Sequence, residues 1–383
     1  MARALGLLGK IATVVTALSV LLAGRAQGWH RLEPGSESWR GPAIRGITVG
    51  PIESSLHPGV GYGTAASART FTYLEEMGAN WVSITPFGRL WSLSSTEIEM
   101  DFEATYEDNR ANVRRAIRQA KARGQRVLLI PHLWIETTGW RGEIDPGDDA
   151  RWEAYKASYR RFVLAWAADA EAGGADAFSI GVECKSWSGR FGGFWIDLIE
   201  EVRRTFSGLL TYSANWDEAE NVLFWDQLDL IGINAFYPLA QEPGATDAQY
   251  REGAEALVPG VRELALTLQM PLAFVELGYT TRTDAAIEPW LWPDDMADVA
   301  YDEREQARAL DALISAFQDE RWFAGFFLWR YYADLYDVSQ EAEWGFSTFG
   351  KEGDEVLRRS FAAPFGADPR LETLPVFAPS ADL

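Results

Sequence analysis

Short apolar segments alternate with longer segments of helical periodicity along this chain, and this alternation constrains the fold more than any other feature. Several of the apolar segments are hydrophobic almost throughout, which is typical of parallel strands covered on both faces. The eight candidate strands are Ile44–Val49, Trp81–Thr85, Arg126–Pro131, Ala177–Val182, Leu209–Ser213, Leu228–Ile233, Leu272–Val275 and Phe323–Leu328. Eight strands that alternate with helices over about 320 residues predict a single (β/α)8 TIM barrel of the α/β class.

The segments between the strands carry apolar residues at the spacing i, i+3, i+4 and i+7 that buries one face of a helix. The four clearest stripes are Val113, Ala116, Ile117 and Ala120; Tyr159, Phe162, Val163 and Trp166; Trp195, Leu198, Ile199 and Val202; and Leu310, Leu313, Ile314 and Phe317. An open doubly wound sheet is the alternative fold. No G-x-G-x-x-G phosphate loop follows the first strand, so the barrel is favoured.

The first 26 residues have the pattern of a cleaved signal peptide. Arg3 and Lys10 precede an uncharged run, Ile11–Ala23, and small residues at Gly24 and Ala26 suit a signal peptidase. This run is shorter than the roughly 20 apolar residues of a membrane-spanning helix, so cleavage is favoured over a retained anchor. We therefore expect a secreted or periplasmic protein, with a catalytic domain over residues 40–362 and an extended C-terminal tail over residues 363–383.

The composition excludes several classes of function. The chain has 35 basic and 56 acidic side chains and a formal net charge of −21, which argues against nucleic acid and against anionic membranes. The single cysteine excludes an internal disulfide framework and every multi-cysteine zinc or iron–sulfur site, and the presence of only three histidines argues against a histidine-based metal centre. We expect no metal, no cofactor and a monomer. The 17 tryptophans are more than folding alone obviously requires.

Two glutamates directly follow apolar strands: Glu183 comes after Val182, and Glu276 comes after Val275. In this fold the loops after the strands build the active site. Two opposed carboxylates suit glycoside hydrolysis, in which one protonates the leaving oxygen and the other, ionised, attacks the anomeric carbon. The alternative for either glutamate alone is a salt-bridged strand-end residue, such as Glu183 with Lys185.

Five local motifs carry a resemblance to a known family: Trp140–Ile144, Ile180–Glu183, Tyr212–Trp216, Ile231–Leu239 and Val275–Tyr279. In their order along residues 44–335 they resemble glycoside hydrolase family 113, which belongs to the clan A retaining glycosidases and is associated with β-1,4-mannan. The resemblance implies a retaining double displacement without a cofactor, with Glu183 as general acid/base and Glu276 as nucleophile. It also implies carboxyl groups about 5–5.5 Å apart.

One residue departs from the pattern of the clan. Much of the clan has an asparagine before the acid/base, which binds the sugar 2-hydroxyl, whereas Val182 stands there in this chain. Another donor must then bind that hydroxyl. The expected partner is a β-linked oligo- or polysaccharide, with mannan or glucomannan first. Two alternatives remain: the same mechanism on another β-glycan such as glucan or xylan, and a non-catalytic carbohydrate-binding protein of the same fold.

Further residues near the strand ends are candidates for substrate binding. We expect Tyr237 to donate a hydrogen bond to Glu276 unless it is a core or rim tyrosine, and Asn215 to bind a sugar hydroxyl unless it forms an Asx turn. Indoles stack on the apolar face of a pyranose, although a buried structural tryptophan is the competing interpretation. Cys184 has no histidine partner in the sequence pattern, so we expect it to pack in the core. The substrate-binding candidates are Trp329, Tyr237, Asn215, His132, Trp134, Arg141 and Trp216.

Overall fold

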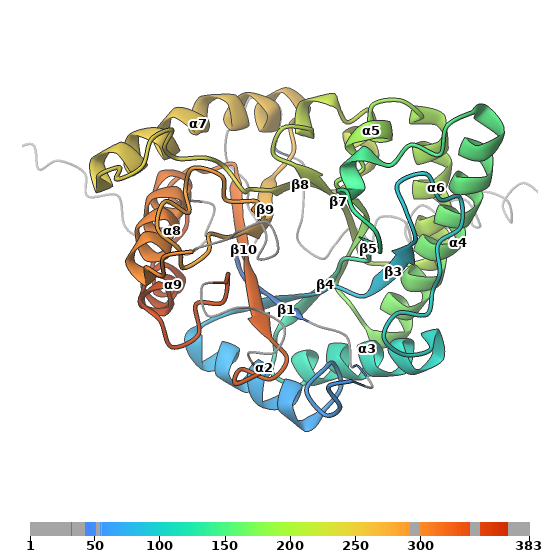
Figure 1. Cartoon of the computed structure of the whole chain (residues 1–383), viewed down its shortest axis with the longest axis horizontal. Helices are drawn as coiled ribbons and strands as arrows, with labels where there is room; N and C mark the ends of the chain where they lie inside the picture. Colours follow the sequence, from blue (N-terminus) through green and yellow to red (C-terminus); the bar gives the residue numbers. More distant parts are fainter. Residues whose placement is uncertain are drawn as a thin grey trace, which may run out of the picture.

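Eight parallel strands close into a barrel in the computed structural model of the chain (Figure 1). The structure describes residues 32, 43–50, 54, 56–291, 299–337 and 345–366. The barrel strands are β1 (Ile44–Gly50), β2 (Trp81–Ile84), β4 (Arg126–Leu129), β6 (Ala177–Val182), β7 (Leu209–Asn215), β8 (Leu230–Asn234), β9 (Leu272–Leu277) and β10 (Phe323–Tyr332). Strand β1 pairs with both β2 and β10, which closes the ring. The predicted (β/α)8 barrel is confirmed.

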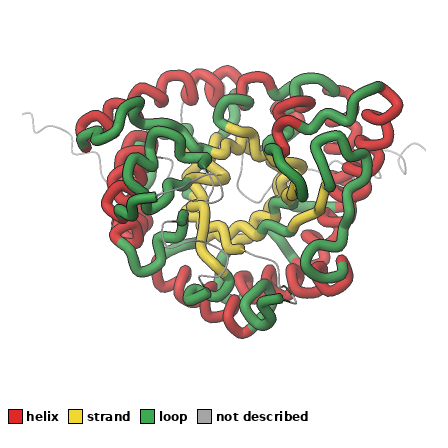
Figure 2. The backbone as a smooth tube through the Cα atoms, viewed as in Figure 1, coloured by secondary structure: helices red, strands yellow, loops and turns green. Residues whose placement is uncertain are grey.

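Helices surround the barrel on the outside (Figure 2). They are α2 (Ala65–Met77), α3 (Tyr106–Lys121), α4 (Asp149–Gly173), α6 (Gly192–Thr205), α7 (Asp247–Leu268), α8 (Glu303–Gln318) and α9 (Glu352–Ala362). Shorter turns are α5 (Lys185–Ser188), η2 (Arg141–Glu143), η3 (Ala219–Asn221) and η4 (Trp225–Gln227). Every residue of the four predicted apolar stripes is buried, so the helical periodicity located the core-facing side of these helices correctly. None of the helices within the described ranges is long and apolar enough to cross a membrane.

Side-chain caps fix where several of the outer helices begin. The Asp148 carboxylate accepts a hydrogen bond of 3.0 Å from the backbone N–H of Arg151 at the start of α4. At the start of α7, Thr246 and Gln249 cap each other reciprocally in a capping box. Such caps satisfy backbone donors that the first turn leaves without partners. They also define how much chain is left between each strand and the helix that follows it, and these loops form the mouth of the barrel.

Two additional short strands extend the barrel above β2 and β4. They are β3 (Phe87–Leu90) and β5 (His132–Ile135), which pair in parallel with Phe87 opposite His132. Each follows a proline, Pro86 or Pro131, whose missing N–H interrupts the ladder of the preceding strand. His132 and Trp134, which follow the third predicted strand, lie in β5. Paired strand backbone holds both side chains at the mouth.

The strand ends differ from the sequence prediction in a way that matters for the site. Strands β7, β9 and β10 are longer than predicted, so Asn215, Glu276 and Trp329 lie within strands and not after them. Residues 1–26 and 367–383 lie outside the described residues. The start of the predicted tail packs on the barrel, since Phe365 is buried against Phe326 with ring centroids 6.2 Å apart.

Candidate active site

Glu183 follows the last residue of β6 and has an unusual backbone conformation. Its φ angle is +49°, in the left-handed region that non-glycine residues rarely adopt. Such a conformation costs on the order of 1–3 kcal/mol and persists only where the surroundings impose it. Here the backbone N–H of Glu183 donates a 2.8 Å hydrogen bond to the carbonyl of Ser213 in β7. The neighbouring strand therefore holds the residue in place, and its side chain is 6% exposed.

Three donors converge on the Glu183 carboxylate. Trp140 Nε1 and Arg141 Nη1 donate to Oε2 over 2.8 Å and 2.7 Å. Asn234 Nδ2, at the end of β8, donates to Oε1 over 3.0 Å. An ionised carboxylate is a pure acceptor, so this arrangement of donors fits the charged form of Glu183. The alternative ion pair with Lys185 is wrong, because Lys185 pairs with Asp217.

Arg141 is held in position from the other side of its guanidinium. Its Nε donates a 3.1 Å hydrogen bond to the carbonyl of Leu133 in β5. Arg141 also begins the turn η2, directly after Trp140. One short loop after β5 therefore supplies two of the three donors to Glu183.

Glu276 lies in β9 and has very different surroundings. Its residue is 3% exposed, and its Oε1 lies 3.1 Å from His132 Nε2. Burial raises the pKa of Glu276 well above its ordinary value, and the nearby Glu183 charge raises it further. Arg141 and Arg330 oppose part of this increase in the pKa of Glu276. Glu276 therefore holds a proton more strongly than a carboxyl group in water does.

His132, the neighbour of Glu276, is enclosed by aromatic rings. Its imidazole is stacked on Trp329 at 5.6 Å between centroids with a 22° interplanar angle, and lies 5.2 Å from the Phe87 ring. Burial, followed by the positive charges of Arg141 and Arg330, lowers the pKa of His132 well below its ordinary value. The imidazole is therefore neutral at neutral pH. It does not supply a positive charge that would keep Glu276 ionised.

The two glutamates act on each other electrostatically, and together they give this site an acid and a base. The negative charge of Glu183 disfavours the ionised form of Glu276 and thereby adds to the increase in the pKa of Glu276. Several buried polar atoms here have no hydrogen-bond partner in the described part of the chain: Nδ1 and Nε2 of His132, Oδ1 of Asn234 and Oε1 of Glu276. Buried polar atoms are nearly always paired, so this group is suited to a polar ligand such as a sugar hydroxyl.

Comparisons with known proteins agree with this geometry. The sequence model of glycoside hydrolase family 113 matches residues 57–351. The chain belongs to glycoside hydrolase family 113. It is therefore a glycoside hydrolase of the retaining clan A type. Among curated proteins, no sequence matches this chain.

Solved structures show the same fold. A family 113 β-mannanase from Alicyclobacillus acidocaldarius, in complex with ManMIm, is 29% identical with a TM-score of 0.72, and the match covers 84% of this chain and 97% of that one. A second family 113 β-1,4-mannanase, at 24% identity and a TM-score of 0.70, covers 84% and 99%. A family 5 mannosidase from Rhizomucor miehei shares the fold at 10% identity and a TM-score of 0.57, covering 87% and 96%.

The structure of this family 113 chain brings most of the predicted site residues to the barrel mouth. Arg141 contacts Glu183, His132 contacts Glu276, and Trp329 is stacked on His132. Trp134 lies in β5 and is 40% exposed, with its ring edge against Phe87. It therefore presents an open indole surface beside the carboxylate pair.

Two predicted contacts differ in the structure. Tyr237 is buried against Trp216 and Phe274, and the described residues include no hydrogen bond from its hydroxyl to Glu276. The predicted donor to Glu276 is wrong, because the side chain that lies against this carboxyl is His132. The Asn215 side-chain carbonyl accepts a 2.8 Å hydrogen bond from the Trp216 backbone, so only its amide group is left for a sugar.

Cys184 packs in the core as predicted. It is a free, buried cysteine, and burial raises the pKa of its thiol to about 12. The thiolate form that a nucleophile needs is therefore not populated at neutral pH.

Sequence reasoning missed Asn234, although the rule that found Glu183 also fits it. Asn234 ends the apolar strand β8, and its amide lies on Glu183. Trp140 begins one of the motifs of the family resemblance, and nothing in the sequence indicates that its indole N–H donates to Glu183. Arg330 was missed because the apolar run that predicts this strand ends at Leu328. Strand β10 continues to Tyr332, so Arg330 lies inside it.

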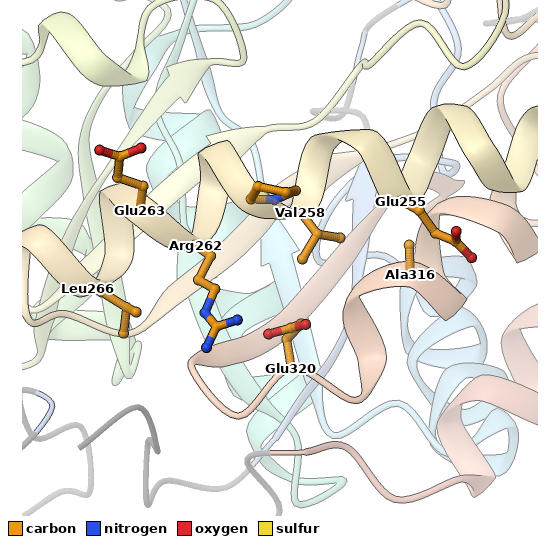
Figure 3. A pocket seen from close by; sticks show the side chains of 8 residues that line it. Glu255, Val258, Arg262, Glu263, Leu266, Ala316 and Glu320 are labelled. Atoms are coloured by element: carbon orange, nitrogen blue, oxygen red, sulfur yellow. The ribbon is translucent and has the colours of Figure 1, made fainter. Parts of the chain in front are cut away.

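A separate groove of about 500 Å³ lies between α7 and α8 on the outside of the barrel (Figure 3). It is lined by Glu255, Val258, Pro259, Arg262, Glu263, Leu266, Ala316 and Glu320. The lining contains no aromatic residue and none of the residues at the strand ends. Its three glutamates lie on or next to the outer helices α7 and α8, away from the ends of the barrel strands.

Proposed function

We propose that this family 113 enzyme cleaves β-1,4-mannosidic bonds in mannan, glucomannan or manno-oligosaccharides with retention of configuration. Glu183 is the general acid/base and Glu276 is the nucleophile. The observation that supports this most strongly is the pair of buried carboxyl groups on β6 and β9, close enough for the charge of Glu183 to raise the pKa of Glu276. The likeness to a β-mannanase at 29% identity supports mannan as the substrate.

The first step is glycosylation of the enzyme. The protonated Glu183 gives its proton to the glycosidic oxygen while the Glu276 carboxylate attacks the anomeric carbon. The bond between that carbon and the leaving oxygen breaks, and an ester to Glu276 forms. In the second step the ionised Glu183 removes a proton from water as the water oxygen attacks the same carbon. The ester bond breaks, and both carboxyl groups regain their initial protonation states.

This mechanism requires a proton to lie on Glu183 when substrate is bound. Without substrate, three donors fit an ionised Glu183, and burial favours the protonated form of Glu276. A glycosidic oxygen beside Glu183 is an acceptor and stabilises a proton there, and sugar hydroxyls that donate to Glu276 stabilise its charge. In this proposal, bound substrate lowers the pKa of Glu276 and so favours the carboxylate that attacks.

Asn234 is our candidate for the group that binds the sugar 2-hydroxyl. Much of the clan uses an asparagine before the acid/base for this contact, and Val182 stands at that position in this chain. Its amide nitrogen lies on Glu183, and its Oδ1 has no partner among the described residues. In the β8–β9 register it is paired with Glu276. The Asn234 amide is thus placed between the two carboxyl groups, where the hydroxyl next to the anomeric carbon would lie. The structure offers no comparable group on Val182, whose side chain is buried and apolar.

The substrate assignment is tested by measuring reducing-sugar release from mannan, glucomannan, xylan and cellulose in parallel. We expect turnover on the two mannose-containing polymers. Activity confined to xylan or cellulose would show that the enzyme acts on another β-glycan and not on mannan. If Glu276→Ala bound the sugar and turned over at the wild-type rate, the catalytic assignment would be wrong. Binding without turnover in the wild type would indicate a carbohydrate-binding protein.

Export is a second part of the proposal. We propose that residues 1–26 are removed during secretion, on the basis of the charged start, the apolar run and the small residues before Gln27. N-terminal sequencing of the exported protein should begin near Gln27. Recovery of the intact N-terminus in a membrane fraction would support the retained anchor in its place.

A further inference from the structure

Two indoles on different loops stack beside the catalytic pair. The rings of Trp216 and Trp290 have centroids 5.9 Å apart and an interplanar angle of 24°. Trp216 follows the end of β7, and Trp290 belongs to the segment between β9 and α8. Trp290 is 45% exposed, so part of its indole faces solvent. An indole with one face packed and the other open to solvent offers a flat apolar surface to a ligand.

The stacked pair is continuous with the catalytic centre through aromatic contacts. Trp216 packs against a small buried cluster formed by Phe236, Trp329 and Phe346. Trp329 is in turn stacked on His132, which contacts Glu276. We call Trp329, Trp216 and Trp290 the aromatic strip. Exposure increases along it, from 6% at Trp329 through a partly buried Trp216 to 45% at Trp290.

We propose that Trp216 and Trp290 form a distal subsite for a mannosyl unit of the chain whose scissile bond lies at Glu183 and Glu276. This proposal rests on the proposed function and extends it to polymer recognition. A pyranose ring offers a flat C–H face that packs on an indole, and the contact excludes water from both. Because this contact lies away from the bond that breaks, it contributes only when the substrate is long enough to occupy it.

Chain-length dependence tests this subsite. The kcat/KM of the wild type and of Trp290→Ala is measured on an aryl β-mannoside and on manno-oligosaccharides of two to six units. We expect Trp290→Ala to lower kcat/KM about three- to tenfold on the long substrates and not on the aryl mannoside, consistent with the energy of one aromatic contact. Trp290→Tyr, which keeps an aromatic face, should retain most of the activity.

Tyr301→Ala is the control, because Tyr301 is also 45% exposed and is not part of the aromatic strip. It should behave like the wild type on every substrate. An equal loss on short and long substrates in Trp290→Ala, or no loss on any, overturns the subsite. A wild type that cleaves none of the mannosides overturns the proposed function itself, so the two failures are distinguishable.

A different observation concerns a third buried glutamate, Glu218. It is 1% exposed, accepts a hydrogen bond from the Tyr212 hydroxyl, and accepts a second one of 3.0 Å from the Asn215 backbone N–H. The Tyr212 hydroxyl itself accepts a 2.7 Å hydrogen bond from the backbone N–H of Cys184. One carboxyl group is thus linked both to the end of β7 and to the residue that follows Glu183.

We also infer that Glu218 is a positioning residue for Glu183. The left-handed backbone of Glu183 needs surroundings that impose it. Cys184 is the next residue along the chain, and the hydrogen bond from its backbone N–H to the Tyr212 hydroxyl holds the C-terminal side of Glu183 in place. Glu218 orients the Tyr212 hydroxyl, because that hydroxyl donates its single proton to Glu218 and presents its lone pair to Cys184. Tyr212→Phe removes the acceptor of the Cys184 N–H and lets the acid/base move, while the hydrogen bond from the Asn215 N–H to Glu218 remains.

A double-mutant cycle tests the link. Tyr212→Phe and Glu218→Gln should each lower kcat about tenfold to a hundredfold, the range expected for misplacement by about 1 Å, with little change in KM. The double variant should lose little more than either single variant, because both changes break one chain of contacts. Additive losses, or an unchanged kcat in both single variants, overturn the inference.

Tyr250 and Glu305 supply a matched control, since the Tyr250 hydroxyl donates to the buried Glu305 between α7 and α8. Tyr250→Phe should leave kcat unchanged even where it lowers the melting temperature. If kcat in Tyr212→Phe falls only in proportion to its folded fraction, the role of the network is purely structural. If Glu183→Gln keeps full activity, the proposed function fails independently of this network.

Discussion

The two catalytic glutamates have the same side chain and opposite surroundings. Glu183 accepts hydrogen bonds from an indole, a guanidinium and an amide. Glu276 has a neutral imidazole beside it, and that imidazole is enclosed by Phe87 and Trp329. The first environment stabilises a negative charge, whereas the second penalises it. Neighbouring loops thus separate the proton affinities of two chemically identical groups.

The difference follows from how the mouth of the barrel is built. The loop after β5 presents polar donors to Glu183, while β5 and β10 present His132 and Trp329 to Glu276. Burial raises the pKa of Glu276, so the nucleophile must lose a proton before it can attack. In the proposed mechanism, sugar hydroxyls that donate to Glu276 stabilise its ionised form.

Removing each glutamate should break the pair in a different way, and this is the largest effect that we expect. Glu276→Ala should lower kcat on the order of 10⁵-fold on every mannoside, because no other group can form the ester. Glu183→Ala should lose about 10²- to 10⁴-fold on mannan and much less on a nitrophenyl mannoside, whose leaving group needs no proton. Steady-state kinetics on both substrates measure this contrast. Equal losses on the two substrates in Glu183→Ala would contradict an acid/base role.

Arg141→Met should remove most of the electrostatic difference between the two environments. Arg141 donates a hydrogen bond to the Glu183 carboxylate, and such a bond to a charged group contributes about 1.5–3 kcal/mol, so we expect kcat/KM to fall about tenfold to a hundredfold. Arg141 also lowers the pKa of Glu276. Without it that pKa rises, and because Glu276 must be ionised to attack, the acidic limb of the pH profile of kcat/KM should move to higher pH.

Arg110→Met is the matched control for this change. Arg110 Nε lies 3.1 Å from the buried carboxylate of Asp169, on α3 and α4 at the outside of the barrel. It should lower thermal stability and leave the pH profile in place. A profile that stays unchanged in Arg141→Met would show that this arginine does not influence the catalytic pair.

Glu218 sharpens the comparison, because it is buried like Glu276 and hydrogen-bonded like Glu183. Burial raises its pKa from 4.5 to about 7. A raised pKa in the folded state adds stability below pH 4.5, and this contribution is lost as the pH rises through about 7. The shift corresponds to about 3 kcal/mol of unfolding free energy between pH 4.5 and 8. In urea unfolding, the free energy of unfolding of Glu218→Gln should not show this decrease with pH. If the free energy of unfolding of the wild type and of the variant depends on pH in the same way, Glu218 does not have the raised pKa.

Much of the fold was predictable from the sequence because parallel barrel strands are apolar on both faces. The run Ala177–Val182 and the helix stripe that contains Trp195 are both visible as patterns, and both are buried as expected. The short strands β3 and β5 were not predictable in this way. Each has four residues directly after a proline, and the two strands pair with each other. A pairing between two such distant short segments leaves no local periodicity.

The catalytic pair was predictable because a charged residue that ends an apolar strand is conspicuous. The environments of the two glutamates were not. The contact of His132 with Glu276 and the stack of Trp216 on Trp290 join segments far apart in the sequence. Burial of Glu218, which follows the exposed Asp217, depends on three-dimensional packing and is not encoded in any local pattern.

The most direct test of the central claim is covalent trapping of the enzyme with a 2-deoxy-2-fluoro-β-mannosyl fluoride, followed by peptide mass spectrometry. The fluorine slows both steps, and the good leaving group restores the first, so the ester intermediate accumulates. We predict one mannosyl adduct on the peptide that contains Glu276, with the label on that residue. A label on Glu183 would reverse the two roles, and the absence of any adduct together with an inverted product would contradict the double displacement.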